Sequence, residues 1–354
     1  MEFVSAMIRQ VWSLKNWCRV RRMTIETDFP GIRLADANAV ARNIEFFQSG
    51  YDIIVNRTIA ARGHKEILGS PPAICRFCSR TTPEVTFKKE AHALPELSGN
   101  RTLISLYECD ECNDRFSAFE DDLGKLTLLE RIAGQVLGKT GVPSAKTERK
   151  KSRIDVNLTG FKIQEHAEDS IVEFDHEQNT MTVTIAPQSY RPLGAFKALV
   201  KIALTLMGEQ EVAKVPEALR WLRAADLTTN QIDDGARYTC ARSWTPGPAP
   251  FANTRVMVLR RKRADVAGPF LIFVLAFGNL SFQIVVPAPQ EDKHLIGQSI
   301  SLRFVPIFPL LDNERVRGPT RYWTQDLSSK AAQKGSASIV FHYDSYTETP
   351  GSAT

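Results

Sequence analysis

Hydrophobic and polar residues alternate along much of the second half of the chain. A two-residue period predicts strands at Ile154–Gln164 and Ile171–Ile185, because successive side chains of a strand point to opposite faces. Two uncharged runs, Phe270–Phe277 and Leu280–Val286, are joined by Gly278-Asn279, a pair typical of two-residue β-hairpin turns. We therefore interpret this uncharged stretch as a buried hairpin and not as a transmembrane helix.

Apolar residues at helical spacing predict helices elsewhere. The run Leu193–Met207 is apolar on nearly every face, which is typical of a helix inside a core, and Pro216 begins a further helix. Met1–Arg22 has apolar residues near helical spacing but no uninterrupted apolar core, so we expect an amphipathic helix and no signal peptide. Asp36 is a candidate cap for the next helix. Further strands are expected at Arg255–Arg260, Ser299–Val305 and Ser338–His342.

The chain has 354 residues, which is too many for one ordinary domain. Its hydrophobic content of 43% and charged content of 24% are close to the average of soluble globular proteins. We expect an α+β protein with a helical N-terminal segment over residues 1–70, a cysteine-bearing unit over 71–135 and a basic linker over 136–153. A larger mixed α+β domain is expected over 154–350. A cytoplasmic protein without a membrane segment follows from these patterns.

A net charge of +5 permits an anionic partner such as nucleic acid but does not demand one. Two runs of positive charge could lie along phosphates: Arg149, Lys150 and Lys151 in the expected linker, and Arg260, Arg261, Lys262 and Arg263 at the end of a predicted strand. A solvated loop and a solvated hairpin end are the alternative interpretations of these two runs.

Four of the six cysteines form two C-x-x-C pairs, Cys75 with Cys78 and Cys109 with Cys112. Two pairs of thiolates, each in a tight turn, predict a tetrahedral zinc site with four sulfur ligands. A redox pair is the competing interpretation, but a redox motif would not need the second pair. Cys18 and Cys240 follow no such pattern, and we expect both to be inert.

The residues between and after these pairs carry candidate chemistry. His92 is followed by Ala-Leu-Pro95, then by Gly99-Asn100, and Asn113 directly follows the second cysteine pair. This arrangement resembles the zinc-bearing members of the HNH endonuclease family, over Cys75 to Asp122. The resemblance implies a ββα-metal nuclease unit stapled by zinc. It also implies a metal-dependent DNA endonuclease of the kind found in bacterial restriction or anti-phage defence.

Hydrolysis of a phosphodiester needs a base near neutral pH, and histidine is the natural candidate. It also needs a hard divalent ion, here Mg²⁺ or Mn²⁺, to stabilise charge on the phosphate and leaving oxygen. His92 is therefore the expected base. The resemblance implies that Asn113 offers its side-chain oxygen to the ion and that Asn100 fixes the loop that bears His92.

One position departs from the family pattern. Family members commonly place a metal ligand directly before the base, where this chain has Ala91. Strand alternation would put Glu90 on the same face as His92, so Glu90 is a candidate ligand, although Lys88 and Lys89 could equally neutralise it as a surface charge. The departure favours an alternative function, a zinc-dependent module that binds nucleic acid or protein without cutting.

The resemblance also bears on the expected partners. DNA is the expected substrate. We expect the C-terminal domain to recognise DNA or to bind an activating ligand or partner protein. Assembly into a homo-oligomer and a monomeric state are both open.

Overall fold

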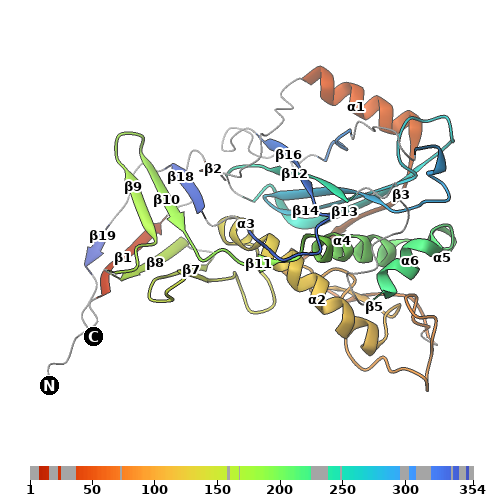
Figure 1. Ribbon diagram of the computed structural model, residues 1–354, viewed down its shortest axis with the longest axis horizontal. Helices are drawn as coiled ribbons and strands as arrows, with labels where there is room; N and C mark the ends of the chain where they lie inside the picture. The colour runs from red at the N-terminus through yellow and green to blue at the C-terminus, as the bar shows by residue number, and fades with distance from the viewer. Residues whose placement is uncertain are drawn as a thin grey trace.

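The computed structural model describes residues 8–15, 23–24, 37–71, 74–157, 160–166, 168–224, 238–247, 249–295, 303–307, 320–335, 338–342 and 348–350. Helices and strands are mixed along the chain, which confirms the predicted α+β class (Figure 1). None of the helices in these ranges is long and apolar enough to cross a membrane.

A six-stranded antiparallel sheet in the order β16-β12-β15-β14-β13-β3 forms the centre of the larger part of the molecule. Its strands are β3 Tyr51–Ile59, β12 Thr239–Trp244, β13 Phe251–Arg261, β14 Leu271–Gly278, β15 Leu280–Val286 and β16 Arg321–Asp326. The predicted hairpin is confirmed, because Phe277 pairs with Leu280 across Gly278-Asn279. Gly278 has a φ of 57°, and a Cβ there would lie 2.4 Å from Val136 Cγ2, so both the turn and its packing require glycine.

Helices cover the two faces of this sheet (Figure 1). Helix α1, Ala37–Gly50, lies on one face, where its Phe47 packs with Ile272 and Val274 of β14. Helix α4, Pro192–Leu206, lies on the other, and the intervening residues Phe273 and Leu275 belong to the main core with it. Every residue of α4 is buried, which confirms the prediction of a core helix. The sheet is therefore the middle layer of a three-layer arrangement.

A five-stranded and a four-stranded sheet lie at the other end of the molecule (Figure 1). The strand predicted at Ile154–Gln164 is instead two strands, β7 Arg153–Asn157 and β8 Gly160–His166, which pair with each other. The strand pattern of Ile171–Ile185 is confirmed as β9 Val172–Asp175 and β10 Thr180–Thr184. The other short elements are β1 Ile8–Lys15, β2 Met23–Thr24, β4 Glu66–Leu68, β5 Leu103–Ser105, β6 Ala145–Lys146, β11 Ser189–Tyr190, β17 Gln333–Lys334, β18 Ser338–His342 and β19 Glu348–Pro350. The remaining helices are α2 Asp110–Leu126, α3 Leu128–Ala133, α5 Glu209–Val212, α6 Pro216–Arg223, η2 Glu96–Ser98 and η3 Lys293–Leu295.

The expected helix near the N-terminus is wrong where the structure describes it. Strand β1 pairs with β8 on one side and with β19 on the other. The expectation of a helical segment over residues 1–70 holds for α1 but not for β3, which pairs with β13 at the edge of the main sheet. In both cases pairing with distant segments decides the conformation, and local spacing does not contain that information. Of the strand expected at Ser299–Val305, residues 303–305 are described and are not in a strand, and the rest lies outside the described ranges.

The expected basic linker, residues 136–153, is folded back onto the protein. Strand β6 pairs with β7, and Ser152 is fully buried. The Asp169 carboxylate accepts a hydrogen bond from the Thr147 hydroxyl and one from each of the Lys151 and Ser152 amides, both at 3.0 Å. This carboxylate lies downstream of the basic run, so the composition of the run alone predicts a loop more open than the structure has.

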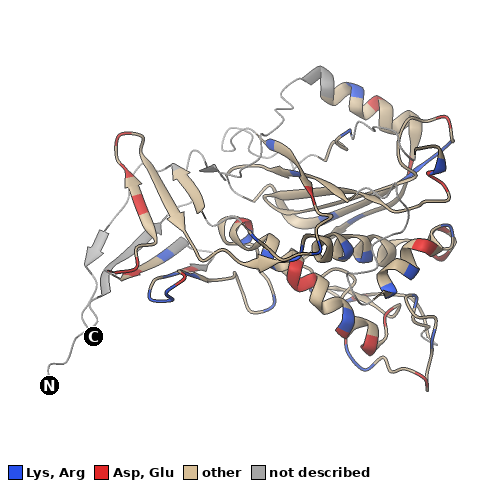
Figure 2. Cartoon of the chain, in the orientation of Figure 1, with Lys and Arg blue, Asp and Glu red and all other residues tan. Residues whose placement is uncertain are grey.

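The cysteine-bearing unit and the C-terminal part share one core. Helix α2 packs against α4, and both signs of charge lie along α2 while α4 carries basic residues (Figure 2). Lys201 of α4 is fully buried, and its Nζ lies 2.8 Å from Glu108 Oε2 and 2.9 Å from Glu120 Oε1. Asp122 of α2 accepts hydrogen bonds from the Arg191 amide at 3.0 Å and the Arg191 Nε at 2.9 Å. These ion pairs fix α2, and with it the candidate site, against the C-terminal part.

Candidate metal centre and nuclease site

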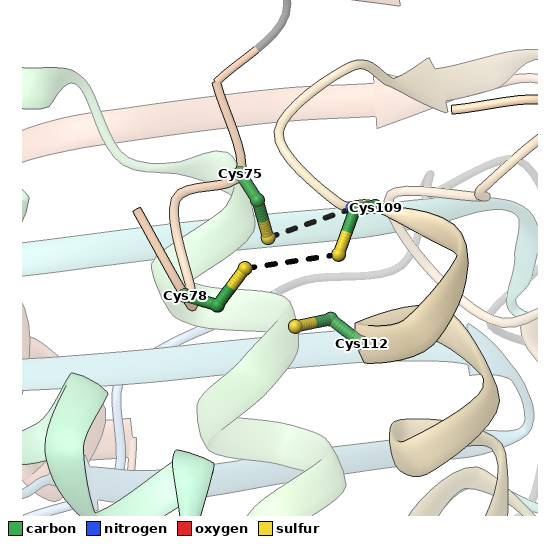
Figure 3. Close-up of side chains that lie close together, drawn as sticks. All are labelled: Cys75, Cys78, Cys109 and Cys112. Atoms are coloured by element: carbon green, nitrogen blue, oxygen red, sulfur yellow. Dashed lines mark hydrogen bonds between the residues drawn. The ribbon is translucent and has the colours of Figure 1, made fainter. Parts of the chain in front are cut away.

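The four paired cysteines converge on one point, as Figure 3 shows. Cys75 and Cys78 lie in a tight turn, Cys109 caps the N-terminus of α2, and Cys112 lies in its first turn. All four sulfur atoms lie within 4.8 Å of one another, and Cys78 Sγ is 3.8 Å from Cys109 Sγ. A tetrahedral zinc ion with Zn–S bonds of about 2.3 Å requires sulfur atoms about 3.8 Å apart. The quartet therefore fits a zinc ion.

The environment of the quartet suits thiolate ligands. Cys75, Cys109 and Cys112 are almost completely buried. A hydrogen bond from the Cys112 thiol lowers the pKa of Cys75 to about 4, whereas burial raises the pKa of Cys109 to about 11. A proton on one thiol thus favours the thiolate form of its neighbour. A bound dication would replace these protons, so zinc affinity should fall at low pH.

Arg76, inside the first cysteine turn, ties the quartet to helix α4. Its Nη1 donates to the carbonyl oxygens of Leu204 at 2.6 Å, Thr205 at 3.0 Å and Met207 at 2.8 Å. The last carbonyl groups of a helix have no partner within the helix, and a cation there is favourable. Sequence reasoning missed this contact, because nothing near Cys75 indicates where α4 ends.

The segment that carries His92 lies beside β5. The Ala93 amide donates to Leu103 O at 3.0 Å, the Ser105 amide donates to Ala91 O at 2.8 Å, and His92 forms an isolated antiparallel bridge with Ile104. The strand expected to carry His92 is therefore reduced to a single bridge, and the expected ββα arrangement is present here only as this bridge, β5 and α2. Ala91 is 1% exposed, so it faces the core as the alternation predicts.

Asn100 holds both sides of this segment together. Its side chain is fully buried, and Nδ2 donates to Leu94 O at 2.8 Å and to Leu103 O at 3.0 Å. Its Oδ1 accepts from the Thr102 amide at 3.1 Å and the Leu103 amide at 2.9 Å. Every hydrogen-bonding group of the amide is used, as expected of a residue that fixes the loop bearing His92.

The His92 ring has one nitrogen inside the protein and one near a carboxylate. Nδ1 is buried and has no hydrogen-bond partner among the described residues. Nε2 lies 3.9 Å from Glu90 Oε1. A buried polar atom without a partner is rare and commonly marks a catalytic role or a position for water or an ion.

Glu90 is held by a cation from another element. Lys65 Nζ lies 2.8 Å from Glu90 Oε1 and also contacts the second carboxylate oxygen. The sequence suggested Lys88 and Lys89 as its neutralising partners, but Lys89 pairs with Asp114 of α2 instead. Lys65 would therefore compete with an ion for the Glu90 carboxylate.

Asn113 lies in the first half of α2, directly after the quartet. Its amide N–H donates to Cys109 O at 2.9 Å, as helix geometry requires. Within the part of the chain that the structure describes, no group hydrogen-bonds the half-buried Asn113 side chain. By contrast, the neighbouring Asp110 carboxylate accepts from the amides of Lys88 at 3.1 Å and Lys89 at 2.8 Å. The Asn113 amide oxygen is thus available to a ligand.

Both predicted phosphate-binding runs contact acidic or carbonyl groups of the protein. Their contacts are Arg149 with Glu168 O at 2.8 Å, Lys151 with Glu168 at 2.7 Å, Arg260 with Asp52 at 2.8 Å and with Glu211, Arg261 with Asp292 at 3.0 Å, Lys262 with Gln48 O at 2.7 Å and Arg263 with Asp265 at 3.0 Å. Arg261 is also buried, while Lys150 is exposed. The structure therefore uses most of this positive charge internally.

Comparison with known proteins bears on this same segment. Residues 75–125 match the model of the HNH endonuclease family, which confirms the resemblance seen in the sequence. The match contains the four cysteines, His92, Asn100, Asn113 and nearly all of α2. No curated protein and no solved structure matches the chain. Residues 75–125 are accordingly similar to an HNH endonuclease domain and carry a cysteine quartet able to hold zinc.

Proposed function

We propose that residues 75–125 form a metal-dependent nuclease that hydrolyses phosphodiester bonds of DNA. The observation that carries this proposal is the placement of His92. Its buried Nδ1 has no hydrogen-bond partner among the described residues, and its Nε2 lies on the side of Glu90. The ring stands on a segment that Asn100 fixes by four hydrogen bonds. Rigid placement of a base is what proton transfer from water requires.

His92 acts in this proposal as the general base. The imidazole accepts a proton from a water molecule, whose oxygen attacks phosphorus, and the bond from phosphorus to the 3′ oxygen breaks. A hard divalent ion such as Mg²⁺ or Mn²⁺ supplies positive charge that stabilises the phosphate and the leaving oxygen. Asn113 would hold that ion through its amide oxygen, with Glu90 as a second ligand once Lys65 releases it. The cysteine quartet would hold zinc and so stabilise the fold.

We infer that the C-terminal part regulates the activity of this nuclease. Arg76 and Lys201 connect residues 75–125 to α4. A ligand or DNA that binds to the C-terminal part could therefore change the position of the site by moving α4. We propose that the protein is a restriction or anti-phage effector in the bacterial cytoplasm. Plaque counts on cells that express the wild type or His92→Ala test this role, and equal counts would contradict it.

A non-catalytic zinc module that binds nucleic acid or protein is the second candidate. Two observations favour it: Ala91 is buried where the family commonly has a ligand, and Lys65 neutralises Glu90. Such a module would bind DNA without cleaving it.

Cleavage of supercoiled plasmid to nicked or linear DNA distinguishes the two candidate functions. The wild type should cut with Mg²⁺ or Mn²⁺, stop when these ions are chelated, and recover when they are restored at unchanged zinc content. Asn113→Ala should need a higher ion concentration for the same rate, because it removes a ligand and not the base. Binding of plasmid without any cutting, in the presence of either ion and of phage-infected cell extract, would favour the second candidate.

A further inference from the structure

A cavity of about 380 Å³ lies where α2 and α3 meet η2 and the segment before β11. Leu97 of η2, Gly124 of α2 and Leu128 of α3 form its apolar part, and Gln188 lies at the β11 side. Arg131 of α3 completes the wall. The cavity is near the C-terminal end of α2, whereas the cysteine quartet is at the N-terminal end. It is therefore distinct from the candidate nuclease site.

Arg131 is a buried cation that contacts only neutral acceptors. It is 8% exposed, its Nε donates to Thr127 Oγ1 at 3.2 Å, and its Nη2 donates to Gly124 O at 2.8 Å. The adjacent Glu130 pairs with Arg242 instead, at 2.7 Å. No carboxylate among the described residues lies within ion-pair distance of Arg131. Glu130 stabilises the Arg131 charge only through space, and a buried charge without a direct ion pair is unfavourable for stability, so this position is a candidate site for an anion.

The guanidinium nevertheless keeps its charge. Burial lowers the pKa of Arg131 to about 10, which leaves it protonated near neutral pH. The other charged groups of the wall have partners in the protein: Glu120 pairs with Lys201 at 2.9 Å, and Asp121 pairs with Lys125 at 2.7 Å. Among the described lining residues, Arg131 is therefore the charged group without a direct ion-pair partner.

We propose that this cavity binds a small organic anion, whose phosphate or carboxylate group contacts the Arg131 guanidinium. Arginine suits both groups, because its planar fork of N–H donors matches two oxygen atoms. The apolar body of the ligand would pack against Leu97 and Leu128, and a cavity of about 380 Å³ is within the usual range for small-molecule sites.

A ligand in this cavity would affect the candidate nuclease site. Leu97 belongs to the segment between His92 and Asn100, so a ligand that packs on Leu97 contacts the loop that carries the candidate base. This consequence rests on the proposed function. Binding itself does not, and it can be measured on protein that cuts nothing.

Thermal unfolding of the full chain tests the site with three related probes. Phenyl phosphate and benzoate carry the two candidate anionic groups on one aromatic ring, and phenol is the neutral counterpart. A ligand that binds only the folded protein raises the unfolding temperature with a saturable dependence on concentration. We expect such a rise with at least one anion in the millimolar range and none with phenol, and the stronger anion identifies the preferred group. No saturable rise with either anion would overturn the proposal.

Two variants and one control assign the rise to the cavity. Arg131→Met should weaken binding at least about tenfold, because hydrogen bonds to a charged group contribute about 1.5–3 kcal/mol. Arg220→Met removes the same charge from an exposed position on α6 and should leave binding unchanged. Equal binding by Arg131→Met and Arg220→Met would refute the site.

Gly124→Ala is a second variant that tests the same cavity if Arg131→Met does not fold. A Cβ at position 124 would lie 3.4 Å from Leu97 Cδ2 and 3.7 Å from Arg131 Nη2, in ordinary contact with both and inside the wall of the cavity. Alanine also favours the helical conformation of α2. The variant should fold at least as stably as the wild type and bind the anion several-fold more weakly, and undiminished binding would contradict the assignment.

Discussion

Replacement of Lys201 by methionine should destabilise the protein by about 2–3 kcal/mol at pH 9, because it leaves a buried carboxylate without its cation. Lys201 is 1% exposed, and the Glu108 side chain beside it is 0% exposed. Methionine has a similar length, so the change removes charge and leaves little empty space. Glu120, the second partner of Lys201, is 24% exposed and can meet water instead.

Removal of one partner of a buried ion pair typically costs about 3–5 kcal/mol. Glu108 can escape its charge by binding a proton, and burial raises the pKa of Glu108 to about 7 even beside Lys201. At pH 9, protonation therefore costs about 1.4 kcal/mol for each of the two pH units above that pKa, which is about 2.7 kcal/mol in all. Proton uptake thus limits the loss to about 2–3 kcal/mol at pH 9, and to less at pH 7.

Urea unfolding of the zinc-loaded protein at pH 9, followed by circular dichroism, measures this loss. The double variant Glu108→Gln with Lys201→Met is the control, because it removes both charges at once. It should recover most of the lost stability, as buried ion pairs commonly add little relative to neutral replacements. A single variant within about 1 kcal/mol of the wild type, or a double variant no more stable than the single one, would refute the reasoning.

Three further expectations concern zinc, the amide that fixes the loop, and pH. Cys75→Ser or Cys109→Ser should lose the metal and unfold the domain, because the binding energy of a structural ion is folding energy; metal analysis of wild type should give about one zinc per chain. Asn100→Ala should lower the free energy of unfolding by about 2–4 kcal/mol, since it leaves buried backbone groups unpaired; urea unfolding checks this, and a loss below about 1 kcal/mol would contradict it. Burial raises the pKa of Asp292 to about 6, so its contribution to stability is full below about pH 4 and is lost as pH rises through 6. The stability difference between wild type and Asp292→Asn should therefore fall by about 1 kcal/mol per unit between pH 5 and 6, and a flat difference would contradict the shift.

The parts of the fold that local chemistry determines could be predicted from the sequence. The hairpin follows from Gly278, which adopts the left-handed conformation that its turn needs. The buried position of helix α4 could be predicted because its sequence is apolar on nearly every face. The cysteine quartet follows from two tight turns of thiols, because few other arrangements satisfy both pairs.

The parts that distant partners determine could not be predicted. Strand β1 is a strand because β8 and β19 flank it, and β3 is one because β13 pairs with it. The same limit applies at the site. The charge of Glu90 meets Lys65 and not its neighbours in sequence, and the exposure of Arg131 to a cavity depends on how α2, α3 and η2 pack. Residue types predicted the candidate chemistry, but the pairing of each charge required the structure.

The central claim is that the two sets of residues have separate roles: four thiolates bind the zinc ion that stabilises the fold, and the His92 imidazole accepts the proton of the attacking water. The rate of plasmid cleavage by His92→Ala, measured at matched zinc content and thermal stability, tests this claim most directly. His64→Ala is the control, because it removes an exposed histidine from a turn before β4. We predict that His64→Ala cuts like the wild type and that His92→Ala is slower by about 10²–10⁴, the usual effect of losing a general base. Cleavage by His92→Ala at the wild-type rate would contradict the account.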